Sequence, residues 1–380
     1  MGDVLIFGDT ERSPEMRHEI PVGIGDPFLY VEVGGERHVV VGSLEVPRLE
    51  GLGLQIHPLE AFGVEEVRRQ LVGQPISALI EEVSRRAVVA LGVTAASVPA
   101  TLPVSFADAV RASGVELTVD RTLFDGRRRS KSPHELDGIR RAQAAAEAGM
   151  TAVRDRLAAA TIGDLGELSL DGVPLTSEVL KAAVSLAFSE HGASATEFVV
   201  SHGAQAAIGH HGGGGAVRAG ETVVVDLWPM DMESGCYADM TRTFVVGEVS
   251  DEIAIWWKLC KRVLDEVTEI ARPGITGKEL YDHACDIFEP AGFPTQRTKE
   301  DGVVLSDGFF HSLGHGVGLE VHEEPLLGLV GREKLVPGDV IAIEPGLYRA
   351  GHGGCRLEDL LLVTETGVER LTTFPYDLAP

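Results

Sequence analysis

A chain of 380 residues with 44% hydrophobic residues suits two domains and can bury a sizeable core. The formal net charge of −25 argues against nucleic acid and anionic membrane surfaces as partners, because their phosphates attract lysine and arginine. No apolar run approaches the roughly 20 residues of a membrane span, and the acidic start MGDVLIFGDTERSPEM lacks the basic segment of a secretory signal.

The cysteines are few and include no CxxC pair, which argues against a disulfide framework. They are Cys236, Cys260, Cys285 and Cys355. We therefore expect a protein of the reducing cytoplasm.

Residues 1–126 predict a small α/β domain, because strand-like runs alternate with a helical stretch over residues 59–72. The strand-like runs are VLIFG, RHVVVGSLEV and AVVALGV. The basic polar stretch DGRRRSKSP, residues 125–133, is interpreted as a linker. A second domain is then expected over residues 127–380.

Two helices open the second domain. Ser132 supplies an N-cap, with Pro133 at the first helical position and Glu135 completing a capping box. The run ELDGIRRAQAAAEAGMTAVRDRLAAA continues that helix, and SEVLKAAVSLAFSEHG predicts another that ends at Gly192.

Strands and helices then follow in blocks. The β-branched runs TEFVVSHG, ETVVVDLWP and CYADMTRTFVVG predict strands, and SDEIAIWWKLCKRVLDEVTEIARPG predicts a helix. Thr276 opens a further helix with a second capping box, and the strand-like DVIAIEPGLY and CRLEDLLLVTETG come last. This order indicates an α+β fold in which helices cover an antiparallel sheet.

Four carboxylates and one imidazole stand within or at the ends of the predicted central strands. They are Asp226, Asp239, His315, Glu344 and Glu358. Each one alone is explained by a turn, a helix cap, an edge strand or a core histidine. Together they are unusual, because carboxylates are almost never buried unpaired, and the three glycines around the histidine allow close backbone approach.

If these five side chains converge, four negative charges meet and need compensation. Two divalent cations would supply it, and a carboxylate-rich set with one imidazole favours Mn²⁺ or Co²⁺, with Zn²⁺ and Fe²⁺ as alternatives. Two such ions ~3.5–4 Å apart hold a bridging hydroxide and polarise a carbonyl. The local chemistry therefore predicts hydrolysis at a two-metal site.

Four motifs in order, DMTRTF with Asp226 upstream, GHGVGLEVHEEP, IEPGLY and RLEDLLLVTETG, resemble the "pita-bread" metallopeptidases of family M24. That family includes methionine aminopeptidase, aminopeptidase P, prolidase and creatinase, and the resemblance runs from Ser132 to the C-terminus. It implies that the five candidates are the metal ligands, with Asp239 and Glu358 bridging the ions and Glu344 also shuttling a proton.

The resemblance also assigns supporting roles. His322 would hydrogen-bond the substrate carbonyl or the tetrahedral intermediate, His311 would be a further pocket histidine, and Arg356 would support the bridging glutamate Glu358. One more family histidine lies in IGHHGGGGAVRAGE, where His210 fits better than His211 when the glycines are aligned.

Two departures from the family pattern leave alternatives. The interval of 13 from Asp226 to Asp239 is about two residues longer than usual, so Asp231 competes as the first ligand, but Asp226 is preferred because it ends the VVV strand, where the family's aspartate stands. Cys236 stands where relatives show glycine, and it is either an unwanted soft ligand or a buried inert thiol.

An additional domain before the catalytic half resembles the layout of the prolidase and aminopeptidase P branch. This implies a homodimeric Xaa-Pro dipeptidase or Xaa-Pro aminopeptidase, whose substrate is a small peptide with proline at its second position. The alternatives are a creatinase-like hydrolase of a small non-peptide amide or amidine, and a binding relative without turnover.

Overall fold

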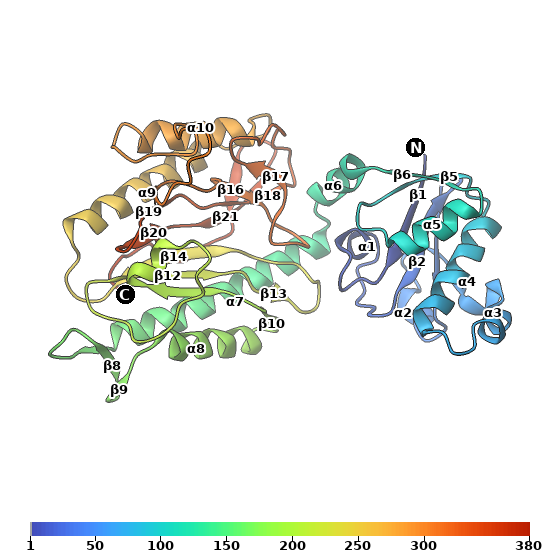
Figure 1. Ribbon diagram of the computed structural model, residues 1–380, viewed down its shortest axis with the longest axis horizontal. Helices are drawn as coiled ribbons and strands as arrows, with labels where there is room; N and C mark the ends of the chain where they lie inside the picture. The colour runs from blue at the N-terminus through green and yellow to red at the C-terminus, as the bar shows by residue number, and fades with distance from the viewer. Residues whose placement is uncertain (1) are drawn as a thin grey trace. The chain divides into compact units, whose positions relative to one another are not determined.

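A computed structural model describes residues 2–380 and divides the chain into two compact units, Met1–Arg128 and Arg129–Pro380 (Figure 1). The division falls two residues after the boundary expected from the sequence. Within the described range, no helix has the length and apolar character needed to cross a bilayer.

The amino-terminal unit contains a six-stranded mixed sheet with the order β4-β3-β2-β1-β5-β6. Its elements are β1 Asp3–Gly8, α1 Pro14–Glu19, β2 Phe28–Val33, β3 Glu36–Val41, α2 Val46–Leu49, β4 Gln55–Pro58, the 3-10 turn η1 Leu59–Phe62, α3 Val64–Gln70, α4 Ile76–Ala90, β5 Ala95–Val98, α5 Val104–Ala112, β6 Glu116–Val119 and α6 Arg121–Arg129. Buried side chains of β1, β2, α4 and α5 form one core cluster of this unit.

Three local predictions in this unit were wrong. The first four residues of AVVALGV form the last turn of α4, which ends at Ala90, because Val83, Ala87 and Val88 recur at helical spacing and are buried in the core of this unit. The helix predicted over residues 59–72 is interrupted at Gly63, whose φ of 79° ends η1 before α3 begins. The first half of the predicted linker is helical in α6, where the Asp120 carboxylate accepts from the Leu123 amide.

The carboxy-terminal unit packs helices against antiparallel sheets. Its elements are α7 Pro133–Ala158, β7 Thr161–Ile162, β8 Leu168–Leu170, β9 Val173–Pro174, α8 Ser177–Glu190, β10 Ala193–Ser194, β11 Val199–His202, the 3-10 turn η2 Gly203–Ala207, β12 Thr222–Leu227, β13 Met230–Asp231, β14 Met240–Val245, α9 Asp251–Ile270, α10 Gly277–Phe288, β15 Asp307–Gly308, β16 Gly314–Gly316, β17 Glu323–Leu327, β18 Val340–Ile343, β19 Gly346–Arg349, β20 Gly353–Arg356, β21 Asp359–Val363 and β22 Val368–Arg370. Both predicted capping boxes, at Ser132 and Thr276, are present.

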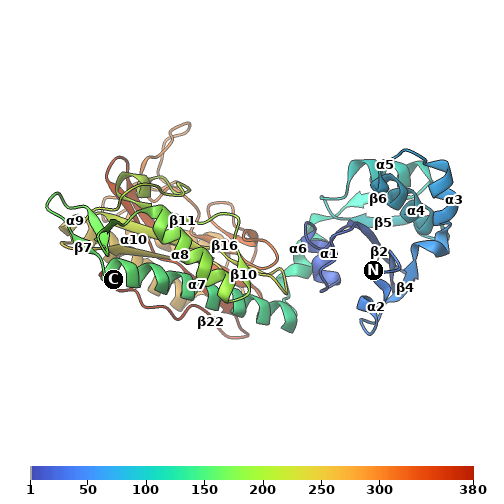
Figure 2. The same ribbon diagram turned by 90° about the horizontal axis from the view of Figure 1, so that it is seen from below.

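Helices cover the strands of this unit from two sides (Figure 1). α7 and α8 lie side by side against β11, β12 and β14, as Figure 2 also shows, and α9 and α10 cover the strands that follow. Two antiparallel sheets, β11-β12-β14 and β17-β16-β18-β21-β22, carry the predicted ligands. The α+β class expected from the sequence is confirmed.

Candidate metal centre

The first two carboxylates come from the β12–β14 hairpin. All six residues of β12, TVVVDL, are buried, so its aspartate is drawn inside with the valines. Asp226 pairs with Thr241 across the hairpin, and Asp239 lies immediately before β14. Both aspartates are therefore held by main-chain pairing close to the same end of the hairpin.

His315 and Glu344 come from neighbouring strands of the second sheet. His315 pairs with Ala342 of β18, and the amide of Glu344 donates to the carbonyl of Leu313 at 2.8 Å. The His315 Nε2 atom lies 3.7 Å from Glu344 Oε1. Close backbone packing around β16 requires glycine at position 314, because a Cβ there would clash with the Ala342 carbonyl.

Glu358 links the two sheets at the junction of β20 and β21. Its amide donates to the Thr241 carbonyl at 3.0 Å, and its carboxylate accepts from the Thr241 hydroxyl at 2.8 Å. These two bonds hold the glutamate against β14.

The structure brings all five predicted ligands to one cavity of about 310 Å³. Ligand atoms of Asp239, His315 and Glu358 lie within 4.8 Å of one another. The cavity is lined by Glu197, His210, Asp226, Trp228, Asp239, His315, Val321, His322, Glu344, Arg356 and Glu358.

Two buried carboxylate oxygens in this cavity lack a protein partner. Within residues 2–380, neither Oδ1 of Asp226 nor Oδ1 of Asp239 accepts a hydrogen bond. A buried oxygen with no donor is costly unless a cation meets it. The oxygen-rich donor set and these two free oxygens therefore fit hard divalent cations.

Without metal, burial shifts the pKa values of four candidate ligands toward their uncharged forms. Burial, reinforced by the neighbouring carboxylates, raises the pKa of Asp239 and of Glu358. Burial also raises the pKa of Glu344 to about 7, with the charge of Asp226 acting in the same direction. The pKa of His315 falls to about 3 through burial and the nearby His322, so this imidazole is neutral and free to bind a metal.

Arg356 of β20 is the buried cation beside the carboxylates. It donates to a carboxylate oxygen of Asp226, to the Tyr348 hydroxyl at 2.9 Å and to the Thr241 hydroxyl at 3.2 Å. Its link to Glu358, which the sequence comparison expects it to support, thus runs through Thr241.

His311 lies behind Glu344 and is not among the residues that line the cavity. Its Nδ1 atom is 4.0 Å from Glu344 Oε2, and its Nε2 atom is 3.0 Å from the Tyr348 hydroxyl. Burial, with the charge of Arg356, lowers the pKa of His311 to about 3. The Nδ1 atom is 2.7 Å from the Ser312 carbonyl, so the ring is held by Ser312 and Tyr348 rather than by Glu344.

The two remaining histidine positions differ clearly. His210 and His322 both line the cavity, and the His322 ring centroid lies 4.2 Å from that of His315. His211 instead accepts a hydrogen bond from the Gly213 amide at 3.0 Å within its own loop. His210 is therefore the member of the pair that faces the candidate site.

The rival ligands are engaged elsewhere. Asp231 accepts from Arg141 at 2.8 and 3.0 Å and from the Ser234 hydroxyl at 2.6 Å. Cys236 is fully buried in an apolar cluster, and burial raises the pKa of its thiol to about 12. The first is a hairpin-tip ion pair and the second an inert core thiol.

Sequence reasoning missed five residues around the site. They are Glu197, Trp228, Thr241, Val321 and Tyr348. Thr241 and Tyr348 stand inside the quoted motifs DMTRTF and IEPGLY, so their position was the available signal. Val321 likewise stands inside GHGVGLEVHEEP, whereas Glu197 and Trp228 carry no local pattern that sets them apart from ordinary loop residues.

Comparison with known proteins shows which peptidases this chain is similar to. The chain is 32% identical over 339 residues to a probable dipeptidase PepE of Mycobacterium bovis, covering 88% of this chain and 82% of the relative. It is 38% identical over 156 residues to the Xaa-Pro dipeptidase of Pyrococcus furiosus, covering 41% of each chain. The fold matches the crystal structure of the prolidase from Pyrococcus horikoshii with a TM-score of 0.74 at 24% identity, over 100% of this chain and 95% of that one.

The family model of metallopeptidase family M24 matches residues 137–365, which include every predicted ligand. The chain therefore belongs to the metallopeptidases of family M24.

Proposed function

We propose that this metallopeptidase uses two divalent cations to hydrolyse the peptide bond before proline, as a Xaa-Pro dipeptidase or Xaa-Pro aminopeptidase. The observation that carries the proposal is the meeting of the five predicted ligands at one cavity, with two buried oxygens free to bind. Asp226, Asp239, His315, Glu344 and Glu358 would hold the ions.

When bound, the cations would activate a water molecule and polarise the scissile carbonyl. Side chains of the protein would carry out the proton transfers. Glu344, a carboxylate that lines the cavity beside the other candidate ligands, would accept the proton of that water and return it.

His322 and His210 line the cavity together with the five candidate ligands. Burial, together with the nearby His210, lowers the pKa of His322, so its ring is neutral and can donate one hydrogen bond to a substrate carbonyl. Arg356, which also lines the cavity, would hold Asp226 by donating to its carboxylate.

The size of the cavity and the relatives support a small peptide substrate. A volume of about 310 Å³ lies at the lower end of ligand pockets, roughly 300–1,000 Å³. Two relatives are named as dipeptidases, one of them for Xaa-Pro peptides. We favour Mn²⁺ or Co²⁺ because four of the five ligands are carboxylates.

The test combines metal analysis with a substrate panel. The expected result is about two Mn²⁺ or Co²⁺ ions per chain and cleavage of Xaa-Pro dipeptides, longer Xaa-Pro peptides or both. Creatine serves as the non-peptide control. A metal-loaded protein that cleaves no Xaa-Pro peptide would overturn the proposed specificity, and cleavage of creatine alone would favour the creatinase-like alternative.

His322→Ala separates ligand from substrate-binding roles at the same site. We expect this variant to keep its metal and lose most turnover. Loss of metal would show that His322 is a ligand.

We also propose a homodimer of the cytoplasm. The four cysteines are free and buried, which suits a reducing compartment. The dimer rests on the resemblance to the prolidase branch, and light scattering of the purified protein tests it.

A further inference from the structure

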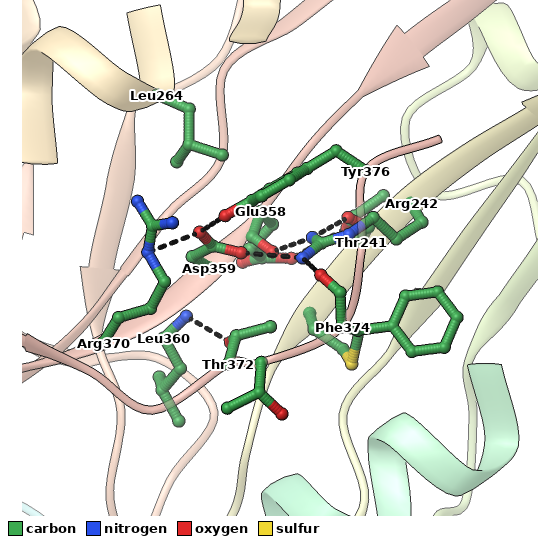
Figure 3. A network of polar contacts seen from close by, with 12 residues as sticks. Thr241, Arg242, Leu264, Glu358, Asp359, Leu360, Arg370, Thr372, Phe374 and Tyr376 are labelled. Carbon is green, nitrogen blue, oxygen red and sulfur yellow. Dashed lines mark hydrogen bonds and ion pairs between the residues drawn. The ribbon is translucent and has the colours of Figure 1, made fainter. Parts of the chain in front are cut away.

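A buried polar network lies immediately behind Glu358, outside the cavity (Figure 3). Its centre is the ion pair between Arg242 of β14 and Asp359 of β21, whose Nη2 and Oδ1 atoms are 2.9 Å apart. Their side chains are 1% and 0% exposed. Burying both charges is expensive, so full hydrogen bonding is required to keep them there.

Each of the five guanidinium hydrogens of Arg242 has its own acceptor. Besides Asp359, the acceptors are four main-chain carbonyls, at Thr241, Glu358, Phe374 and Pro375, with distances of 2.9, 2.7, 2.8 and 2.9 Å. Two of these carbonyls belong to the site, and two belong to the segment near the C-terminus. One side chain thus joins the site to that segment.

The segment from Phe374 to Leu378, here called the tail strap, is neither helix nor strand but is well anchored. The Leu378 carbonyl accepts from the Val245 amide at 2.8 Å, and the Tyr376 carbonyl accepts from the Trp257 indole at 3.1 Å. The Tyr376 hydroxyl donates to Asp359, and its ring centroid lies 4.3 Å from the Arg242 guanidinium. The strap therefore closes the far side of the Arg242–Asp359 pair.

The site side of the network leaves Glu358 little freedom. Its carbonyl accepts from Arg242, its amide donates to the Thr241 carbonyl, and its carboxylate accepts from the Thr241 hydroxyl. The Thr241 carbonyl receives both the Glu358 amide and Arg242. Loss of the Arg242 guanidinium would therefore remove a hydrogen bond from the carbonyl of each residue at once.

We propose that Arg242, Asp359 and the tail strap are positioning elements that hold Glu358 and Thr241 in the geometry needed to bind metal. The inference rests on the proposed role of Glu358 as a ligand. None of the described residues of the strap lines the cavity, and neither does Arg242 or Asp359. Their effect is therefore transmitted through the main chain of Glu358.

Two variants, one substituted and one truncated, test this, with Mn²⁺ titrated calorimetrically into metal-free samples. Arg242→Lys keeps the charge but cannot make five hydrogen bonds. A chain ending at Thr373 keeps Arg242 and every site residue. It removes two acceptors of Arg242, the carbonyls of Phe374 and Pro375. Each variant should weaken Mn²⁺ binding at least about tenfold, as loss of a partner behind a metal ligand commonly does.

Leu180→Ala is the matched control, because it removes a fully buried side chain of α8 that neither lines the cavity nor bonds to Arg242 or Asp359. It should lower the melting temperature and leave the Mn²⁺ dissociation constant unchanged. All titrations are run well below each variant's melting temperature, with circular dichroism confirming the fold. If Arg242→Lys does not fold, the Mn²⁺ affinity of the truncated chain alone tests the inference.

A double variant, Arg242→Lys in the truncated chain, tests whether the tail strap acts through Arg242 or stabilises the unit independently of it. If the strap acts through Arg242, truncation should weaken Mn²⁺ binding much less in the Arg242→Lys background than in the wild type. Wild-type Mn²⁺ affinity in either folded single variant, or full additivity in the double variant, would overturn the inference. A wild-type protein that binds no Mn²⁺ would instead overturn the proposed metal centre.

Discussion

The hydroxyl of Thr241 donates a 2.8 Å hydrogen bond to the carboxylate of Glu358, although the two residues are 117 positions apart. The same hydroxyl accepts from Arg356 Nε at 3.2 Å. One small side chain thus holds both a predicted metal ligand, Glu358, and the buried cation Arg356 by hydrogen bonds.

Thr241→Val should therefore lower both the stability of the metal-free protein and its affinity for metal. Glu358 would lose a donor and Arg356 an acceptor, so we expect the free energy of unfolding to fall by about 1–3 kcal/mol. Mn²⁺ affinity should fall roughly tenfold. Urea unfolding and calorimetric titration measure the two effects.

Thr222→Val is the control for that substitution. Thr222 is buried in the neighbouring strand β12, and its hydroxyl has no hydrogen-bond partner in the part of the chain described. Its replacement should cost no stability and no Mn²⁺ affinity. Equal losses in both variants would show that Thr241 contributes only packing.

Asp239→Asn should abolish metal binding without destabilising the metal-free protein. The carboxylate is buried beside Glu358 and Asp226, whose charges disfavour its own. At pH 8 the melting temperature without metal should be at least that of the wild type. The rise that Mn²⁺ produces in the wild type should disappear, as scanning calorimetry would reveal.

Asp231→Asn should behave in the opposite way. This carboxylate is paired with Arg141 and Ser234 rather than facing the cavity. We expect a loss of about 1–3 kcal/mol in the free energy of unfolding and a normal metal content. A metal-free Asp231→Asn protein would make Asp231 the first ligand.

His210→Ala and His211→Ala form a second matched pair. Only His210 lines the cavity, whereas His211 caps its own loop at the Gly213 amide. His210→Ala should keep its metal and lower kcat about 100-fold, the cost of removing one donor from a reacting carbonyl. His211→Ala should stay close to wild type, and the reverse ranking would exchange their roles.

The loop that carries His210 should also give a pH-dependent contribution to stability. His202 precedes it, with Nδ1 2.9 Å from the Glu221 carboxylate and Nε2 3.3 Å from the Gly214 carbonyl. The hydrogen bond to Glu221 raises the pKa of His202 above its usual 6.5. This contribution is complete below pH 6.5 and is lost as the pH rises through the raised value.

His202→Gln removes that contribution. The difference in melting temperature between wild type and variant should therefore be larger at pH 5.5 than at pH 8.5. A difference that is the same at both pH values would show that the imidazolium charge is not involved.

Local chemistry explains which predictions succeeded. The capping boxes at Ser132 and Thr276 depend on groups three residues apart, so a short pattern suffices. AVVALGV fits a strand or a helix equally well, and only the sheet beneath α4 decided between them.

By itself the sequence determined which candidate ligands to expect, their order along the chain and the α+β class, because these follow from strand ends, glycines and motifs within short segments. It also favoured Asp226 over Asp231 and His210 over His211, and the tertiary structure has the favoured member of each pair lining the cavity. The tertiary structure alone created the contacts of Arg242 with the tail strap, over 132 and 133 positions. Such contacts arise from how sheets and helices pack, and no short segment of sequence encodes the distance between residues so far apart.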